Sequence, residues 1–366
     1  MLELADIFRE AGLAYRQAYT ERMLPSHLTA MRDIEACRTA ALGGHLRACD
    51  HCDVRRYSYH SCRNRHCPKC HTDQTRRWLN RQRGRLLPGS YFLVTFTLPA
   101  ELRALARSHQ KILYRLLMIS AAKALLKLTA DPRYLGARPG LLAVLHTWTR
   151  AMIYHPHAHI LVTAGGWRDG QGWVRSVHPN FLVPGWALSR IFRAKLRDAV
   201  LRAGLAHLAP PNVWSKEWVV HLQHAGTGDK VLEYLARYVF RIALVNSRLE
   251  RFENGRVTFR YRDNKTRTIK HCTILAAEFI ARFLQHVLPS GFSKVRSYGL
   301  FSPSRKSDLE KARTEMLAAT PGPSPAGPVP AEANSLRDPH DPPRCPVCGI
   351  GLLRIIEILP RWRPPP

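Results

Sequence analysis

The sequence predicts an α+β protein built around a mostly antiparallel sheet, on three observations. Segments rich in β-branched and aromatic residues interleave with amphipathic helical segments, but without the regular strand–helix repeat of a parallel sheet. Two predicted strands, 141–148 and 154–163, are separated by a short connection and are expected to pair. A further pair, 256–261 and 266–270, is typical of a hairpin with its turn at 262–265.

The N-terminal region is predicted to be helical and then rich in turns. Residues 1–30 have an amphipathic pattern, and a second short helix is expected near 27–34. Residues 37–71 are dense in cysteine and histidine, with many turn formers. Residues 72–85 are predicted to form a helix with a strongly basic face, carrying Arg76, Arg77, Arg81, Arg83 and Arg85.

The middle of the chain supplies the sheet and most of its helices. The segment YFLVTFTL at 91–98 predicts a strand, and Pro99 ends it. Gly165-Gly166 and Asp169-Gly170 predict turns. Asp229 is a plausible N-cap of the helix that follows it. Helices are expected at 101–128, 186–203, 229–244 and 273–287, with a short strand at 218–222.

Composition and these elements divide the chain into four segments. Eight prolines fall between Ala319 and Pro343, which favours a linker. The expected segments are a helical and cysteine-rich region at 1–85, a region at 86–305 that holds the predicted sheet, a proline-rich linker at 306–343, and a tail with one Cys-x2-Cys pair at 344–366.

The charge of the chain indicates a nucleic-acid partner. The 366 residues include 56 Lys and Arg, 44 of them arginine, and the formal net charge is +29. Arginine matches phosphate geometry and stacks on bases, so this excess favours DNA or RNA over a small-molecule substrate. Charge alone also fits a ribosomal-type protein and indicates nothing about catalysis.

The sequence predicts a cytoplasmic, nucleoid-associated protein. Its N-terminus lacks the basic and apolar regions of a signal peptide. The longest apolar stretch, 113–128, is interrupted by Arg115, Lys123 and Lys127, so no membrane span is expected. Six of nine cysteines lie between Cys37 and Cys70, which in such a chain favours metal binding over disulfides.

Two Cys-x2-Cys pairs predict a structural zinc site. Cys49 and Cys52 form one pair, Cys67 and Cys70 form the other, and 14 residues separate the two pairs. Four thiolates at this spacing suit one tetrahedral Zn²⁺, and the alternative is four reduced structural cysteines. Five side chains are left over in this region, namely Cys37, His45, Cys62, His66 and His71. The candidate second site is the set of Cys37, His45, Cys62 and His66.

A third pair, Cys345 and Cys348 in CPVCG, has no evident mate in the sequence. Cys272 is the one cysteine left outside all these groups. The simplest interpretation of the third pair is a degenerate half-ribbon on the C-terminal tail, with no clear catalytic role.

The segment HPHAHILV predicts half of a divalent-metal site. Side chains alternate along a strand, so His157 and His159 project from one face. Two imidazoles on one face of a rigid strand need further ligands to hold a divalent metal ion. His146 on the preceding strand is the first candidate third ligand, Glu233 is another, and His155 is a candidate supporting residue.

The helix predicted at 229–244 carries a candidate pair of nucleophiles. Tyr234 and Tyr238 are four residues apart and share one helical face with nearby cations, Arg237 and Arg241. A tyrosine hydroxyl needs a metal-polarised phosphate and nearby cations to attack at neutral pH. Core packing is the alternative role for such a pair.

Taken together, these motifs resemble the rolling-circle transposases of bacterial insertion sequences, the two-tyrosine HUH group of the insertion-sequence ninety-one type, related to Helitrons. The resemblance covers roughly residues 15–305. Its matching segments are CRNRHCPKC at 62–70, VLHTW at 144–148, HPHAHILV at 155–162, YLARYVFR at 234–241 and RSYGLF at 296–301.

The resemblance implies an HUH-type fold, a central antiparallel sheet flanked by helices after a small zinc-binding domain. Residues 1–85 would then be the helical and zinc-binding DNA-binding domain, and residues 86–305 the catalytic domain. It implies that His157 and His159 hold Mg²⁺ or Mn²⁺ and that Tyr234 and Tyr238 attack single-stranded DNA at transposon ends and target. Each attack would leave a 5′-phosphotyrosine and a free 3′-hydroxyl. The chain departs from Helitron proteins because it has no helicase phosphate-loop motif, so a host helicase or supercoiling would separate the strands.

Two other functions remain open on sequence alone. A plasmid rolling-circle initiator or relaxase uses the same metal clamp and tyrosine chemistry, although the N-terminal cysteines and the two-tyrosine spacing argue against it. A zinc-finger DNA-binding regulator would share the basic charge and the cysteines but would not nick DNA.

Overall fold

The computed structural model describes residues 2–70, 75, 78–80, 82–176, 178, 180–227, 232, 243–263, 266–318 and 342–362. Beyond the strands and longer helices given below, short 3-10 turns occur at Thr20–Arg22, Ala40–Leu42, Pro68–Cys70, Ala100–Leu102, Ala206–Leu208, Pro211–Trp214, Asn246–Arg248 and Pro303–Arg305. Among the described residues, no helix is both long and apolar enough to cross a membrane.

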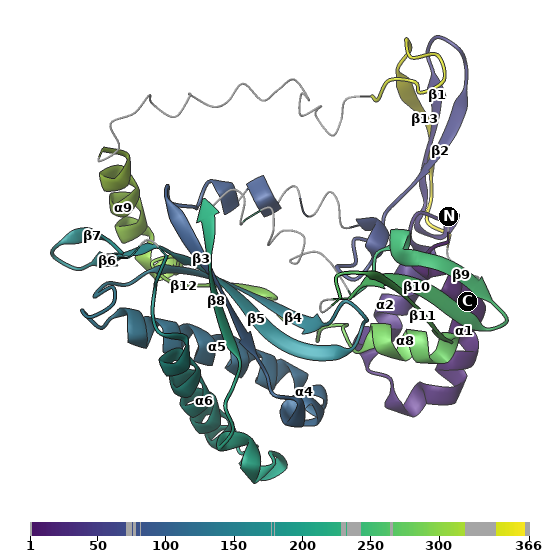
Figure 1. Ribbon diagram of the computed structural model, residues 1–366. Helices are drawn as coiled ribbons and strands as arrows, with labels where there is room; N and C mark the ends of the chain where they lie inside the picture. The colour runs from purple at the N-terminus through teal and green to yellow at the C-terminus, as the bar shows by residue number, and fades with distance from the viewer. Residues whose placement is uncertain are drawn as a thin grey trace.

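A five-stranded antiparallel sheet forms the centre of the molecule and confirms the predicted α+β class (Figure 1). Its strand order is β12-β4-β5-β3-β8. The strands are β3 (Ser90–Thr97), β4 (Gly140–Trp148), β5 (Tyr154–Thr163), β8 (Val220–Thr227) and β12 (Val295–Gly299). Strands β4 and β5 pair with each other, as the sequence predicts, and both lie inside the sheet. The edge strand β12 was not predicted from the sequence.

Three helices cover one face of this sheet, namely α4 (Arg103–Ser108), α5 (Gln110–Thr129) and α6 (Gly185–Arg202). Their apolar side chains pack on alternate strand residues such as Phe96, Leu145 and Ile160, which are fully buried. We refer to this cluster as the helix-side core. The single helix predicted at 101–128 was wrong, because His109 has non-helical backbone angles and separates α4 from α5.

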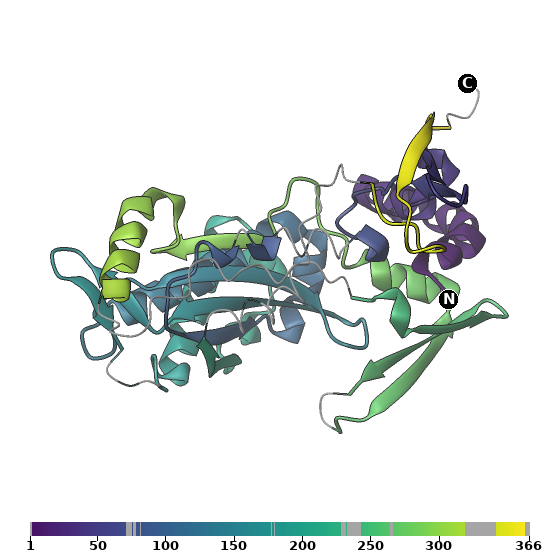
Figure 2. The same cartoon turned by 90° about the horizontal axis from the view of Figure 1, so that it is seen from above.

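The opposite face of the sheet is covered at one end by α9 (Lys306–Ala318) and by the hairpin of β6 (Gly165–Arg168) and β7 (Gly172–Arg175) (Figure 2). Leu93, Val144 and Leu161 pack there with Leu309 of α9, in what we call the α9-side core. The helix α9 occupies residues that the sequence analysis assigned to the linker. It is fixed by Glu315, whose carboxylate accepts a hydrogen bond from the Trp173 amide.

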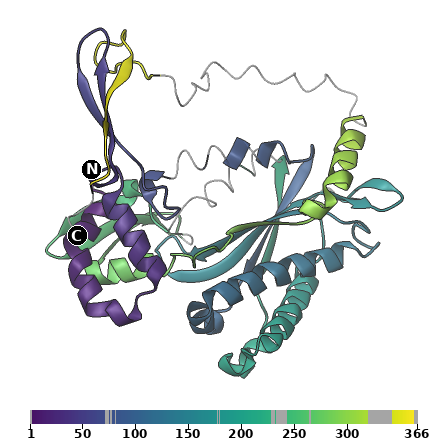
Figure 3. The same ribbon diagram turned by 180° about the vertical axis from the view of Figure 1, so that it is seen from behind.

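The N-terminal helices form a second unit together with a later part of the chain (Figure 3). Phe8 of α1 (Leu4–Tyr19) and Met31 of α2 (Pro25–Ala36) share a core with Phe283 of α8 (Ala276–Leu284). A three-stranded sheet completes this unit, in the order β11 (Ile269–Leu275), β10 (Arg256–Arg262) and β9 (Leu249–Glu253). The hairpin β10–β11 confirms the predicted strand pair, but β11 extends through the first residues of the helix expected at 273–287.

A third small sheet joins the two ends of the chain. The hairpin of β1 (Gly44–Cys49) and β2 (Arg55–Tyr59) lies in the region that the sequence describes only as turn-rich. Strand β13 (Leu353–Leu359), from the C-terminal tail, pairs antiparallel with β1. In Figures 1 and 3 the yellow β13 runs beside this hairpin, away from the central sheet.

Candidate metal centres

Three histidines meet on the two middle strands of the central sheet. His146 lies on β4 and is paired in register with His157 on β5, two residues before His159. One ring nitrogen from each of the three lies within 4.8 Å of the others, and the ring centroids are 4.5 to 5.1 Å apart. The structure therefore gathers His146, the proposed third ligand, with the two histidines of the predicted clamp.

Strand alternation places this cluster on the face opposite the helices α5 and α6. Ala158 and Ile160, which lie between and after the histidines, point into the helix-side core. Val144, paired with His159, points into the α9-side core. The three histidines thus continue a row of buried apolar residues toward the β4–β5 turn.

Hydrogen bonds fix the rings of the two β5 histidines through their Nδ1 atoms. Nδ1 of His157 lies 2.7 Å from the carbonyl oxygen of His155, which can only accept, so His157 carries its proton on Nδ1 when neutral. Nδ1 of His159 lies 2.9 Å from the hydroxyl of Thr95 on β3. Outer hydrogen bonds of this kind leave Nε2 of a neutral imidazole available to a metal ion.

Thr95 was not among the predicted site residues, because its place beside His159 depends on the pairing of β3 with β5. Thr95 and His159 are directly opposite each other in the β3–β5 ladder. His155 was proposed as a supporting side chain, but its ring accepts a hydrogen bond from the Arg103 guanidinium at 2.7 Å. Its backbone oxygen, and not its ring, holds His157.

Burial keeps His157 and His159 uncharged at neutral pH. His146 and His159 are buried, whereas His157 is partly exposed and is the most exposed of the three. Burial lowers the pKa of His157 to about 4 and that of His159 to about 3. Neutral imidazoles at pH 7 present lone pairs and not positive charges, which is the state that a metal ion requires.

The chemistry of the three side chains fits a divalent transition metal. Three nitrogen ligands, one of them from a partly exposed side chain, would leave positions for water or a phosphate oxygen. Imidazole binds Mn²⁺ and later transition metals more readily than Mg²⁺, which prefers oxygen. Glu233, the other candidate third ligand, lies outside the described residues, as do Tyr234, Arg237, Tyr238 and Arg241.

One residue near the predicted tyrosines is described. Leu232, two residues before Tyr234, is fully buried in the α9-side core with Leu93 and Val144. The chain therefore reaches the histidine-bearing face of the sheet immediately before the predicted tyrosine segment.

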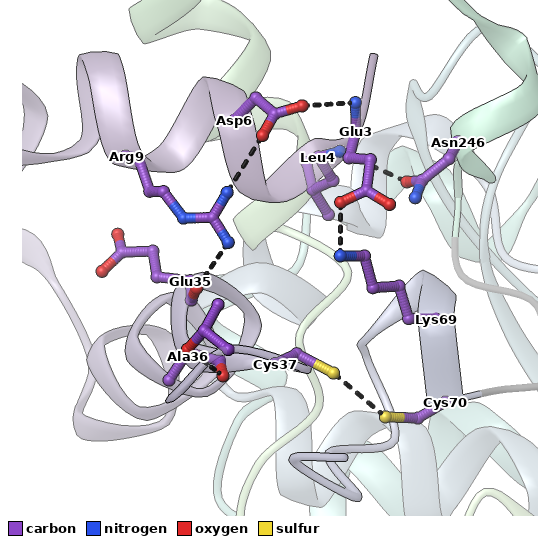
Figure 4. Close-up of polar contacts among 11 residues, drawn as sticks. Glu3, Leu4, Asp6, Arg9, Glu35, Ala36, Cys37, Lys69, Cys70 and Asn246 are labelled. Carbon is purple, nitrogen blue, oxygen red and sulfur yellow. Dashed lines mark hydrogen bonds and ion pairs between the residues drawn. The ribbon is translucent and has the colours of Figure 1, made fainter. Parts of the chain in front are cut away.

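A first cluster of four cysteines lies in the N-terminal unit. It consists of Cys37, Cys62, Cys67 and Cys70, with ligand atoms within 4.8 Å of one another. The sulfurs of Cys37 and Cys62 each lie 3.6 Å from that of Cys70. Figure 4 shows Cys37 and Cys70 facing each other, next to an ion pair between Lys69 and Glu3 that ties the cluster to α1.

A second four-cysteine cluster joins Cys49 and Cys52 to Cys345 and Cys348. The predicted grouping of Cys49 and Cys52 with Cys67 and Cys70 was therefore wrong. The reason is that β1 and β2 carry the first pair to the far end of a hairpin, whereas Cys67 and Cys70 stay in the core of α1 and α2. Cys345 and Cys348, for which the sequence shows no partner pair, complete the second cluster.

The two cysteines and two histidines predicted to form a second metal site do not come together in the structure. Cys37 and Cys62 belong to the first cluster. Nε2 of His45 lies 3.1 Å from Nε2 of His60, and Nε2 of His66 accepts a hydrogen bond from the Leu288 amide. Cys272, on β11, belongs to neither cluster.

The four thiols of the first cluster are close enough to shift one another's pKa values. Hydrogen bonds with Cys37, Cys62 and Cys67 lower the pKa of Cys70, and hydrogen bonds with Cys37, Cys62 and Cys70 raise the pKa of Cys67. Four thiolates at this separation repel one another, and a bound Zn²⁺ removes that repulsion.

Comparison with known proteins agrees with this arrangement. Residues 140–308 match a family described as putative transposase, and residues 7–98 match one described as transposase zinc-binding domain. The chain is 38% identical to the putative transposase y4qJ of Sinorhizobium fredii, over 100% of this chain and 97% of that protein. It is 29% identical to the transposase for insertion sequence element IS801 of Pseudomonas savastanoi pv. phaseolicola, over 91% and 89% respectively.

No solved structure matches the chain. The two family matches cover the first cysteine cluster and the three histidines, but not Cys345 and Cys348. The chain belongs to the insertion-sequence transposase family of the insertion-sequence ninety-one type, with an N-terminal zinc-binding domain.

Proposed function

We propose that this transposase nicks single-stranded DNA at transposon ends through a 5′-phosphotyrosine and transfers the strand by rolling-circle transposition. The observation that carries the proposal is the cluster of His146, His157 and His159 on the neighbouring strands β4 and β5. In this cluster hydrogen bonds orient His157 and His159, and burial lowers the pKa of both. A histidine cluster with a purely structural role would not need a partly exposed member. A catalytic metal site needs one side accessible, because the substrate must reach the ion.

The proposed reaction exchanges one phosphodiester for another. The phenolic oxygen of a tyrosine bonds to phosphorus, the bond from phosphorus to the 3′ oxygen breaks, and the phenolic proton is released as the 3′-hydroxyl forms. A Mn²⁺ or Mg²⁺ ion held by the histidines would polarise the phosphate. The covalent intermediate retains the phosphodiester energy, so a later 3′-hydroxyl can attack it without another energy source.

Tyr234 and Tyr238 are the proposed nucleophiles, with Arg237 and Arg241 supplying positive charge to the phosphate. In a helix, their four-residue spacing would put both hydroxyls on one face, about 6 Å apart along the axis. The burial of Leu232 on the histidine-bearing side of the sheet supports this assignment. Two tyrosines allow cleavage at a donor end and at a target without release of the first strand.

Two described tyrosines offer matched controls. Tyr298 packs against the helix-side core, on the side of the sheet away from the histidines, and burial raises its pKa. Tyr261 lies on β10 in the N-terminal unit. Neither position suits attack on a phosphate held by the histidines.

The experiment incubates the full chain with Mn²⁺ and labelled single-stranded oligonucleotides that carry the element ends, and then detects covalent adducts by denaturing electrophoresis. The wild type and Tyr298→Phe are expected to form a 5′-linked adduct. Each of Tyr234→Phe and Tyr238→Phe should lose strand transfer and retain some nicking, and the double variant should form no adduct. An adduct in the double variant would refute the assignment of the nucleophiles.

The same assay separates the other functions. A DNA-binding regulator would bind the oligonucleotides and leave them intact. A replication initiator or relaxase would nick an origin sequence but would not join element ends to a target. The transposase relatives favour the proposed activity over both. Duplex substrates that react only when supercoiled, or with a helicase present, would identify host factors as the source of strand separation.

A further inference from the structure

The second cysteine cluster draws its members from opposite ends of the chain. We propose that Cys49, Cys52, Cys345 and Cys348 bind one structural Zn²⁺, so that the C-terminal tail completes the zinc-binding module of the N-terminal region. Two of these ligands lie outside the segment that matches the transposase zinc-binding domain, which ends at residue 98.

The sulfur positions fit a single tetrahedral ion. The sulfur of Cys49 lies 3.7 Å from that of Cys348, and the sulfur of Cys52 lies 3.7 Å from that of Cys345. Four sulfurs about 2.3 Å from one Zn²⁺ would be about 3.8 Å apart in a regular tetrahedron. A disulfide would bring two sulfurs to about 2.05 Å, and an iron–sulfur cluster would spread them further apart, because its thiolates bind different irons.

The backbone supports three of the sulfurs as metal-bound thiolates. The amide nitrogens of His51, Val347 and Gly351 each lie 3.4 Å from a cysteine sulfur, that of Cys49, Cys345 and Cys348 respectively. Hydrogen bonds of this kind stabilise negative charge on sulfur. The two Cys-x2-Cys loops thus have matching conformations, each with an amide directed at its own first cysteine.

Contacts beyond the cysteines fix the tail in one register. Asp50, between the cysteines of the first pair, accepts a hydrogen bond from the Leu352 amide at 2.8 Å and pairs with the Arg354 guanidinium at 2.9 Å. Gly351 lies so close that a Cβ atom there would be 2.5 Å from the sulfur of Cys49. The tail sequence therefore suits this partner and is not a remnant of a separate module.

Apolar burial alone does not explain why β13 stays on β1. The local core consists of Cys49, Cys345 and Leu353, with a few partly buried neighbours. Ile355 and Ile358 on the same strand remain 50% and 72% exposed. A small three-stranded sheet with so little apolar contact needs a metal ion or another cross-link to be stable.

The test counts zinc in the full-length protein and its variants by elemental analysis. Cys345→Ser/Cys348→Ser and Cys49→Ser/Cys52→Ser are each expected to contain one zinc equivalent less than the wild type. The variant with all four substitutions should also lose one equivalent, because both pairs serve the same ion. Cys272→Ser is the matched control and should lose none.

Three results would overturn the proposal. They are an unchanged zinc content in either double variant, a loss of two equivalents when all four cysteines are replaced, and recovery of the missing zinc when the two double variants are mixed. The last result would show that the zinc site forms between two chains and not within one chain.

A second measurement keeps the cysteines intact. A protease site inserted between residues 330 and 331 allows the tail to be cut from the folded protein. The cut tail is expected to co-elute with the rest of the chain in size-exclusion chromatography and to separate after zinc chelation. Gly351→Val, which crowds the Cys49 sulfur, should release the tail without chelator. Separation of the wild-type tail in the presence of zinc would contradict the proposed closure.

Discussion

The hydrogen bond between Thr95 and His159 offers a direct test of how the histidine cluster is held. Thr95→Val keeps the shape of the side chain and removes its hydroxyl, which lies 2.9 Å from Nδ1 of His159. His159 is only 9% exposed, so water cannot easily take the place of that hydroxyl. Loss of such an outer partner typically weakens metal binding 10- to 100-fold, which is about 1.4 to 2.7 kcal/mol.

The assay is calorimetric titration of the purified protein with Mn²⁺, followed by the nicking assay across a range of metal concentrations. We expect the dissociation constant of Thr95→Val to rise at least about 10-fold and nicking to recover at saturating metal. Thr97→Val is the matched control, because Thr97 is also half-buried and lies opposite His157. Unchanged affinity in Thr95→Val, or an equal loss in Thr97→Val, would refute the orienting role of Thr95.

Three further predictions follow from the same geometry. Titrations should show tighter binding of Mn²⁺ than of Mg²⁺, because the cluster supplies nitrogen and not oxygen; the reverse order would indicate ligands beyond the three histidines. Burial lowers the pKa of His286 from 6.5 to about 3. Below pH 6.5 the unfolded chain therefore binds a proton at this histidine that the folded chain does not bind. The free energy of unfolding then falls by about 1.4 kcal/mol for each pH unit. Denaturant titrations between pH 5.5 and 4 should show this slope reduced in His286→Gln but not in the exposed control His207→Gln. Finally, Arg65→Lys should lower the free energy of unfolding by about 1.5 to 3 kcal/mol, since the guanidinium donates to the carbonyls of Phe292 and Pro289 and an ammonium cannot span both. Chemical denaturation measures the loss, and an unchanged midpoint would contradict it.

The central sheet and its metal-binding face could be predicted because they depend on local patterns. Alternation in HPHAHILV places two histidines on one face wherever the strand lies, and the short connection to the preceding strand makes His146 a neighbour. The edge strand β12 was not predicted, since Val295–Gly299 is short and has little alternation to distinguish it from a loop. Its place beside β4 comes from pairing with a segment some 150 residues earlier.

The cysteine pairing could not be predicted because spacing alone does not determine it. Any two Cys-x2-Cys pairs can close a tetrahedral site, and proximity in sequence favoured the pair at Cys67 over the pair at Cys345. The hairpin β1–β2 prevents that pairing, since it carries Cys49 away from the core in which Cys67 is buried. Long-range strand pairing, here β1 with β13, is the information that the sequence does not display.

The β4–β5 hairpin connects the first cysteine cluster to the histidines. Its strands carry the histidine cluster, while Met152 in its turn is fully buried in the core that contains Cys37 and Cys67. His286 lies within 3.2 Å of the Met152 carbonyl and of the Thr147 hydroxyl, and so fixes both sides of the turn. Trp148 stacks on His146 with ring centroids 5.0 Å apart. Because interiors are close-packed, we expect a change in the core around Cys37 to shift the hairpin and with it the histidines. A structural zinc in the N-terminal unit would therefore support the geometry of the proposed cleavage site as well as any contact that this unit makes with DNA.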